Sequence, residues 1–190
     1  MPGREALSDA ALLAATAAGD AGAYTRFVER HQGAALRYLR LLAADPAAVE
    51  DALQEAFLAA WRSAGGFRGG DSARSWLLAI ARHALYRQFR RRAGEPEDLV
   101  SLETLGLAAG WGEPHSPDPV ASHADRAAVR QALAALNATD REILWLRDVE
   151  GLSGEECSGL LALAPPAVKS RLHRARLRFA AQLRGAPHDR

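Results

Sequence analysis

Residues 151–184 read GLSGEECSGLLALAPPAVKSRLHRARLRFAAQLR, and this stretch decides the fold of the C-terminal half. Ser153-Gly154-Glu155-Glu156 forms a capping box, in which a serine and the third-following glutamate satisfy each other's end groups. Pro165-Pro166 then forces a turn and opens a basic helix that runs to about Arg184. A short helix, a tight turn and a basic helix together predict a helix-turn-helix.

The predicted last helix has two distinct faces. At about 100° per residue, one stripe is apolar and is expected to face the core; it holds Val168, Leu172, Ala175, Phe179 and Leu183. The opposite side holds Ser170, His173, Arg174 and Leu177, flanked by Lys169, Arg171, Arg176 and Arg178. This arrangement suits major-groove binding, because central residues reach base edges while flanking cations neutralise phosphates. An ordinary solvated basic helix is the alternative.

The rest of the chain also has helical periodicity. We expect helices over residues 5–19, 20–43 and 46–63, with Asp20 as an N-cap and a break at Asp45-Pro46. Residues 65–70 are expected to form a loop, after which Asp71 or Ser72 caps a helix that continues to about residue 92. A second helical unit begins near Ser122, and Thr139 or Asp140 is expected to start its next helix.

Residues 93–120 differ from their surroundings, since they are rich in glycine and proline and follow no period. The predicted fold class is therefore all-α: two small helical domains joined by a flexible acidic linker, the second with a helix-turn-helix. The expected boundaries are an N-terminal extension (1–17), a first domain (18–92), the linker (93–120), a second domain (121–185) and a tail (186–190).

Composition narrows the class of protein. The net charge of the 190 residues is only +1, but its distribution is uneven. Residues 74–92 and 165–190 are basic, and residues 93–125 carry acids but no Lys or Arg, which suggests two nucleic-acid contacts on one chain. Cys157 is the single cysteine, so no disulfide or cysteine zinc cluster within the chain is expected. The N-terminus lacks a long apolar run, and we expect no signal peptide and no membrane insertion.

The helix expected before residue 92 has a second candidate nucleic-acid face. The side assigned to the core holds Leu77, Ile80, Ala81 and Ala84. The other side is expected to project Arg82, His83, Tyr86 and Arg90 together. Cations interleaved with aromatic rings suit unpaired bases, because rings stack on bases while arginines hold phosphates. Trp76 lies beside this face, although Trp76 and Phe89 can equally be ordinary core residues.

The helix over residues 46–63 presents Asp51, Gln54, Glu55, Leu58 and Arg62 on its outward face. An exposed leucine among carboxylates suggests a protein partner with a basic, partly apolar surface. Taken alone, this pattern is more typical of a solvated face.

In this order and spacing, the three faces resemble the extracytoplasmic-function (ECF) sigma factors of the sigma-70 superfamily. The resemblance is carried by residues 51–57 (DALQEAF), 75–82 (SWLLAIAR), 144–153 (LWLRDVEGLS) and 168–176 (VKSRLHRAR). It covers roughly residues 18–92 and 120–184.

The resemblance implies a role for each face. Residues 18–92 would be region 2, in which Asp51, Gln54, Glu55 and Leu58 bind the β′ subunit of core RNA polymerase. The melted −10 element would be captured by the loop residues Phe67 and Arg68 together with Trp76, Arg82, His83, Tyr86 and Arg90. Residues 120–184 would be region 4, binding the −35 element as duplex through Arg147, Lys169, Ser170, Arg171, His173, Arg174, Arg176 and Arg178.

The implied function is that of an alternative sigma factor, which brings core polymerase (its β′ and β subunits) to promoter DNA and promotes melting. The resemblance also implies a cognate anti-sigma factor, a cytoplasmic location, no catalysis and no cofactor. Two positions depart from the family pattern. His83 stands where asparagine is common, and Pro166-Ala167 replaces the usual Gly-Thr, which removes a hydroxyl able to cap the helix or contact a phosphate.

The sequence disfavours two other classes of function, a stand-alone regulator and an enzyme. A stand-alone helix-turn-helix regulator would use only the C-terminal unit and would carry an α/β receiver domain, but no alternating strand and helix pattern precedes residue 92. An enzyme is disfavoured because the six histidines form no ligand spacing and the glycine-rich loop at 65–70 lacks the P-loop lysine.

Overall fold

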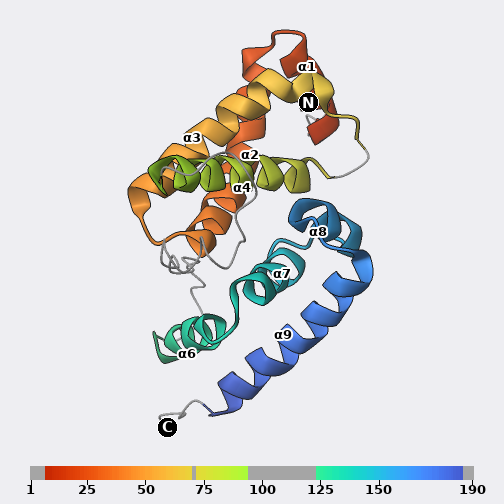
Figure 1. The fold of residues 1–190 in the computed structure, drawn as a ribbon. Coiled ribbons are helices and arrows are strands. Elements are labelled where there is room, and N and C mark those ends of the chain that lie inside the picture. Colours follow the sequence, from red (N-terminus) through yellow and green to blue (C-terminus); the bar gives the residue numbers. More distant parts are fainter. Residues whose placement is uncertain (1–6, 70–71, 94–122, 186–190) are drawn as a thin grey trace, which may run out of the picture.

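The computed structural model describes residues 7–69, 72–93 and 123–185, and every regular element in these ranges is a helix (Figure 1). The N-terminal bundle contains α1 (Asp9–Ala17), α2 (Ala21–Leu42), α3 (Pro46–Ser63), a 3₁₀ turn η1 (Ala64–Gly66) and α4 (Ala73–Ala93). The C-terminal bundle contains α6 (His123–Ala134), α7 (Ala138–Asp148), α8 (Gly154–Leu161) and α9 (Pro165–Gly185). The all-α prediction is therefore confirmed.

Most helices begin at the residues that the sequence indicates. The side chain of Asp20 accepts a hydrogen bond from the amide of Ala23, and Asp45 caps α3 directly before Pro46. Ser72 Oγ accepts from the amide of Ser75 at the start of α4. The capping box of α8 is complete, since Glu156 N donates to Ser153 Oγ and Ser153 N donates to Glu156 Oε2.

Two predicted helix starts are wrong. The first helix begins at Asp9 with Ser8 as its cap, not near residue 5. The helix expected to start at Thr139 or Asp140 is capped by Asn137, whose Oδ1 accepts from the amide of Asp140. Because Asn137 takes the cap, the carboxylate of Asp140 is available for contacts with another helix.

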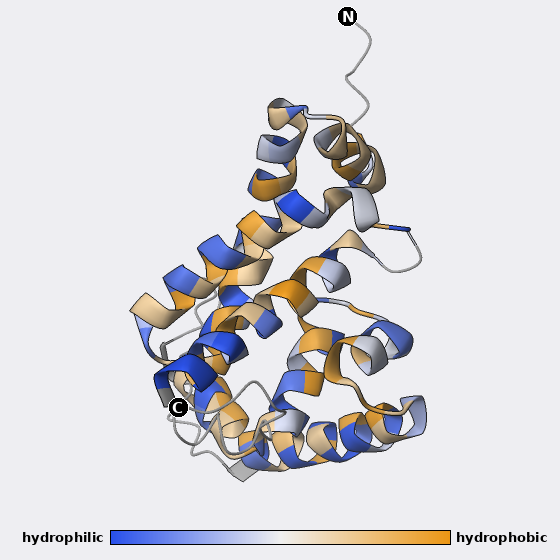
Figure 2. Cartoon of the chain, turned by 45° about the horizontal axis from the view of Figure 1, so that its top comes forward, coloured by the Kyte–Doolittle hydropathy of each residue, from blue (hydrophilic) through white to orange (hydrophobic). Residues whose placement is uncertain are grey.

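The core of the N-terminal bundle is built from alanines and leucines that let four helices approach closely. α3 packs along α4, and α2 crosses both, with Phe27, Leu39, Leu78 and Leu85 completely buried. Figure 2 shows apolar segments turned between the helices and polar ones turned outward. Trp61, near the end of α3, is 38% exposed.

The C-terminal bundle is organised around α7, whose residues Ala138–Leu146 are all buried. Successive residues of a helix point about 100° apart, so three consecutive charges face three neighbours. Asp140 contacts α9, Arg141 donates to the carbonyls of Leu133, Ala134 and Leu136 at the end of α6, and Glu142 faces the N-terminal bundle. Each buried charge is thereby paired or hydrogen-bonded.

The two bundles touch along α4 with α8 and along α2 with α7. The predicted linker at 93–120 lies outside the described residues apart from residue 93, and so does the predicted tail at 186–190. Among the helices that the structure describes, none combines the length and the apolarity that crossing a membrane requires.

Candidate nucleic-acid interface

The outward face of α9 is as the sequence predicts. Val168, Leu172 and Ala175 are buried against the bundle, and Phe179 and Leu183 lie partly buried on the same stripe. Ser170, His173, Arg174 and Leu177 are exposed on the opposite side. Within the described part of the chain, neither Lys169 nor Arg174 forms an ion pair, so both cations are available to an anionic ligand.

Three flanking arginines of α9 are held by carboxylates of α7. The buried Asp140 accepts from Arg171 Nη1 at 3.3 Å and from Arg178 Nη1 at 3.2 Å. Asp148 forms two hydrogen bonds with Arg176, and this pairing raises the pKa of Arg176 above its ordinary value. These three arginines are positioned along α9 by carboxylates that balance their charges locally, whereas Lys169 and Arg174 have no carboxylate partner in the described part of the chain.

A groove of about 300 Å³ runs beside α9 at the turn of the helix-turn-helix. Arg147 lies in its lining together with Ser153 and Lys169, and the Arg147 guanidinium donates to the carbonyl of Leu152. Arg147 of α7 therefore lines the same groove as Lys169 of α9. The groove brings α7, α8 and α9 to one concave surface.

The predicted single-strand face of α4 is divided by the structure. His83 is exposed and lines a pocket of about 380 Å³ with Trp76 and Arg87 of α4 and Ser63 of α3. Trp76 is half-buried and its ring lies 5.4 Å from that of Phe67, so it belongs both to the core edge and to the pocket. Arg68 is exposed in the loop after η1, and Arg90 is half-buried farther along α4.

Arg82 and Tyr86 do not share the open surface of His83. The Arg82 side chain is 16% exposed, lies 4.7 Å over the Tyr86 ring and donates through Nε to Glu142 of α7 at 2.9 Å. Burial lowers the pKa of Arg82, but the Glu142 carboxylate outweighs this effect and the pKa is raised overall. The pKa of Tyr86 is raised by burial and by the nearby Glu142 charge. The expectation that these two side chains project outward is corrected: Glu142 of α7 holds Arg82, and the Arg82 guanidinium lies over the Tyr86 ring.

The outward face of α3 is open. Asp51, Gln54 and Leu58 are exposed, with Leu58 at 56%, and together with Glu55 they line a groove of about 450 Å³. Glu55 is ion-paired with Arg87 and lies 3.7 Å from Arg91. The four predicted residues thus share one surface, which combines carboxylates with an uncovered apolar side chain.

Comparisons with known proteins show the family of the chain. The family model "Sigma-70 region 2" matches residues 27–95, and "Sigma-70, region 4" matches residues 126–179. The chain is 35% identical over 94% of its length to the ECF RNA polymerase sigma factor SigM of Mycobacterium tuberculosis, covering 86% of that protein. It is 30% identical to the RNA polymerase sigma factor CnrH of Cupriavidus metallidurans, covering 93% of this chain and 94% of that protein.

The chain belongs to the ECF sigma factors. The structure of CnrH in complex with the cytosolic domain of CnrY matches with a TM-score of 0.65 at 26% identity, covering 94% of this chain and 99% of that one. The sigma factor RpoE of Bartonella quintana, in complex with the anti-sigma factor NepR, shares the fold, with a TM-score of 0.64 at 24% identity over 88% and 98% of the chains. This ECF sigma factor directs RNA polymerase to promoters.

Two residues that matter to the sigma factor's surface were missed by sequence reasoning. Asp140 positions two arginines of α9, and Glu142 covers Arg82 of α4. Both stand in the run Asp140-Arg141-Glu142, which by itself resembles the solvated first turn of a helix. The available signal was their position: three charges immediately before Ile143 on a helix that is central to its bundle.

Proposed function

We propose that this sigma factor binds the −35 element as duplex DNA through α9. The observation that carries the proposal is the outward face of a helix-turn-helix, where Ser170, His173 and Arg174 are exposed opposite a buried stripe. Such residues reach base edges in the major groove, while Lys169 and the flanking arginines neutralise phosphates. Arg147 adds a cation from the neighbouring helix.

The −10 element is assigned to region 2. The pocket beside His83 is mainly apolar; it is lined by the exposed His83 and by Trp76, whose ring contacts that of Phe67. An unpaired base that enters it would stack on a ring and hydrogen-bond to His83. Arg68 of the preceding loop and Arg90 of α4 are further proposed contacts, and Arg82 and Tyr86 would join this surface once Arg82 is released from Glu142. Holding unpaired bases favours the melted promoter, which is the proposed route to DNA opening.

The α3 face is proposed to bind the β′ subunit of core RNA polymerase, with further contacts to β. Its support is the uncovered Leu58 among Asp51, Gln54 and Glu55, a composition that suits a basic, partly apolar partner surface. The proposed domain boundaries are those of the sequence: residues 18–92 for region 2, 93–120 for the linker and 121–185 for region 4.

The proposed function implies a cellular location, a mode of action and a regulatory partner. The sigma factor would act in the cytoplasm, where polymerase and promoter meet, and by binding rather than by catalysis. Its relative CnrH has been solved with the cytosolic domain of CnrY, which supports an anti-sigma partner for this chain as well. The alternative of a stand-alone helix-turn-helix regulator does not account for the match of residues 27–95 to region 2.

The direct test is run-off transcription by core polymerase on fragments of the genome that encodes the chain. Wild-type protein should direct specific transcripts. Arg174→Ala should lose about 1–3 kcal/mol of discrimination between sequences selected from a random duplex pool. Arg178→Ala should weaken all duplexes alike and reduce the salt slope by about one. If the two variants weaken every sequence equally, the assignment of the α9 faces is wrong.

A further inference from the structure

The carboxylate of Glu142 in region 4 is buried against region 2. Glu142 of α7 has a side chain only 1% exposed, and its Oε1 accepts hydrogen bonds from the Tyr38 hydroxyl of α2 and from Arg82 Nε of α4. Tyr38 is completely buried, and burial together with the Glu142 charge raises its pKa well above the ordinary value. Residues 60 and 104 positions away in the sequence therefore converge on one oxygen atom.

Two more acids of region 4 accept hydrogen bonds from region 2 along the same interface. The Glu150 carboxylate accepts from Arg37 Nη2 at 3.2 Å, and its backbone carbonyl accepts from Arg74 Nη1 at 3.0 Å. Glu156 Oε1 accepts from the amide of Ser72 at 2.9 Å. In each case region 4 supplies the acceptor and region 2 the donor, so the contact is directional.

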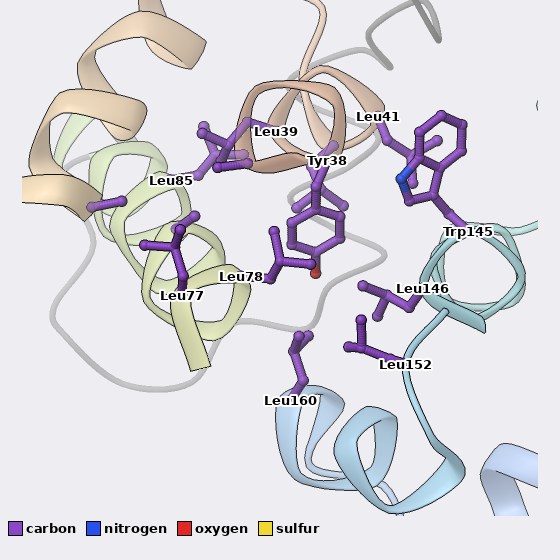
Figure 3. Packing of buried hydrophobic residues seen from close by; sticks show 14 of the residues in the cluster. Tyr38, Leu39, Leu41, Leu77, Leu78, Leu85, Trp145, Leu146, Leu152 and Leu160 are labelled. Carbon is purple, nitrogen blue, oxygen red and sulfur yellow. The ribbon is translucent and has the colours of Figure 1, made fainter. Parts of the chain in front are cut away.

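An apolar layer surrounds the polar contacts. In Figure 3 the Tyr38 side chain points from α2 toward the space between α4 and α7, and Leu146, Leu152 and Leu160 approach it from region 4. Trp145 lies near Leu41 of α2 in the same view. Burial of these side chains attracts the two regions without fixing their orientation. The hydrogen bonds of Glu142 fix how region 4 is oriented on region 2.

The covered surface is the one that would hold unpaired promoter bases. Arg82 is engaged by Glu142, and Tyr86 lies under the Arg82 guanidinium. A phosphate cannot bind the Nε side of Arg82 while Glu142 of α7 occupies it, and a base cannot stack on the face of Tyr86 that the Arg82 guanidinium covers. The closed arrangement and full −10 capture are therefore mutually exclusive at these two residues.

The contact between the two regions is specific, but some of its buried polar atoms lack hydrogen-bond partners. Among the residues that the structure describes, Glu142 Oε2, Arg82 Nη2 and Trp145 Nε1 are buried without a hydrogen-bond partner. Unsatisfied buried polar atoms are costly, and a buried ion pair often stabilises little once desolvation is counted. An interface of this kind fixes one arrangement without making its opening prohibitive.

We infer that Glu142 is an autoinhibitory contact, which holds region 4 over the −10-binding face of α4 and must release Arg82 before a melted strand binds there. The inference rests on the proposed −10 function of that face. Through Glu142, α7 would have a regulatory role in addition to supporting the helix-turn-helix. DNA and Glu142 compete for the same guanidinium, so binding of either disfavours the other.

The test compares full-length wild-type protein with Glu142→Gln, which removes the charge at nearly constant volume, and with Tyr38→Phe, which removes one donor. Fluorophores on Gln32→Cys of α2 and Gln131→Cys of α6, both exposed positions, report the distance between regions by energy transfer without DNA. A labelled single-stranded oligonucleotide of random sequence reports strand binding. Glu29→Gln, at an exposed position of α2, is the matched control.

Both variants should lower energy transfer, and Glu142→Gln should bind the single strand at least about fivefold more tightly, the lower end of typical coupling between sites. Unchanged transfer in both variants would show that Glu142 does not hold the regions together and would overturn the inference. Reduced transfer without tighter strand binding would also overturn it, by showing that the covered face is not the strand site. Run-off transcription by the wild-type protein tests the proposed function independently of either result.

Discussion

His31 shows how one buried titratable side chain ties the N-terminal helix to the rest of region 2. Its side chain is 3% exposed, and Nε2 lies 2.9 Å from Asp9 Oδ2 of α1. Burial lowers the pKa of His31; Asp9 opposes this effect, while Arg74 and Arg30 add to it. The folded protein therefore binds a proton at His31 less readily than the unfolded chain does.

The sign of the pH dependence follows from linkage. Below the unfolded pKa of about 6.5 the unfolded state takes up more protons at this residue, so stability falls as the pH decreases from there toward the lowered folded pKa. We predict a Tm component that is level above pH of about 7 and declines below about 6.5. Thermal melts of His31→Gln should lack this component. A decline of equal steepness in both proteins would show that His31 is not its source.

Individual residues were predictable where their role is local. The exposed face of α9 followed from periodicity, because Val168, Leu172 and Ala175 can only be buried together. The sequence placed Arg82 on the side of α4 opposite Leu77, Ile80 and Ala81. What lies on that side is Glu142, 60 positions later, and no periodicity within α4 specifies a contact of that sequence separation.

At the scale of elements, caps were the most reliable signals. Asp20, Ser72 and the Ser153–Glu156 box start helices as expected, because each motif satisfies orphan amides within four residues of itself. The start of α7 was placed too late. Asn137, Thr139 and Asp140 are all acceptable caps by residue type, and only the packing of Asp140 against α9 decides among them.

The α8 capping box is expected to stabilise more than one short helix. Glu156 accepts from Ser153 N inside the box and from Ser72 N at the start of α4. Partial burial alone would raise the pKa of Glu156, but these hydrogen bonds outweigh it and lower the pKa to about 2. The carboxylate is thus ionised throughout the neutral range and holds two helix starts together.

We predict that Ser153→Ala lowers the free energy of unfolding by about 1 kcal/mol, because the amide of Glu156 loses its cap. Urea melts measure this change, and amide exchange should show reduced protection confined to α8 and the α4 start. Ser158→Ala, a serine within α8 that is no N-cap, serves as a comparison and should not reduce protection at the α4 start. If Ser153→Ala leaves both measurements as in wild type, the box contributes nothing to stability.

At the scale of the molecule, the sequence predicted two helical units but not their mutual packing. The core of each unit follows from apolar periodicity, whereas the contact between them depends on three acids of region 4 meeting donors of region 2. These pairs form only when the two folded units meet, so the sequence of either unit alone does not predict them. Consequently the proposed −35-binding surface on α9 is open in the structure, and the proposed −10-binding surface on α4 is partly covered.

This asymmetry separates the roles of two neighbouring residues in promoter opening. His83 is exposed at the mouth of its pocket, so His83→Ala should remove base capture alone. Arg82→Ala should both remove a phosphate contact and release Glu142, two effects of opposite sign. We therefore predict that His83→Ala impairs open-complex formation more than closed-complex binding, and more than Arg82→Ala does. Stacking and capture are worth roughly 1–3 kcal/mol per base, so the defect should be readily measurable.

Permanganate footprinting of unpaired thymines on a duplex promoter measures the open complex, and gel shift of the closed complex provides the comparison. A template with a pre-melted −10 bubble should rescue a variant that is defective only in opening. It should not fully rescue His83→Ala, because captured bases are still not held. His83→Asn, which introduces the residue common in the family, should restore opening with a changed −10 preference. Wild-type thymine reactivity in His83→Ala would instead mean that the pocket beside His83 meets only solvent in the open complex.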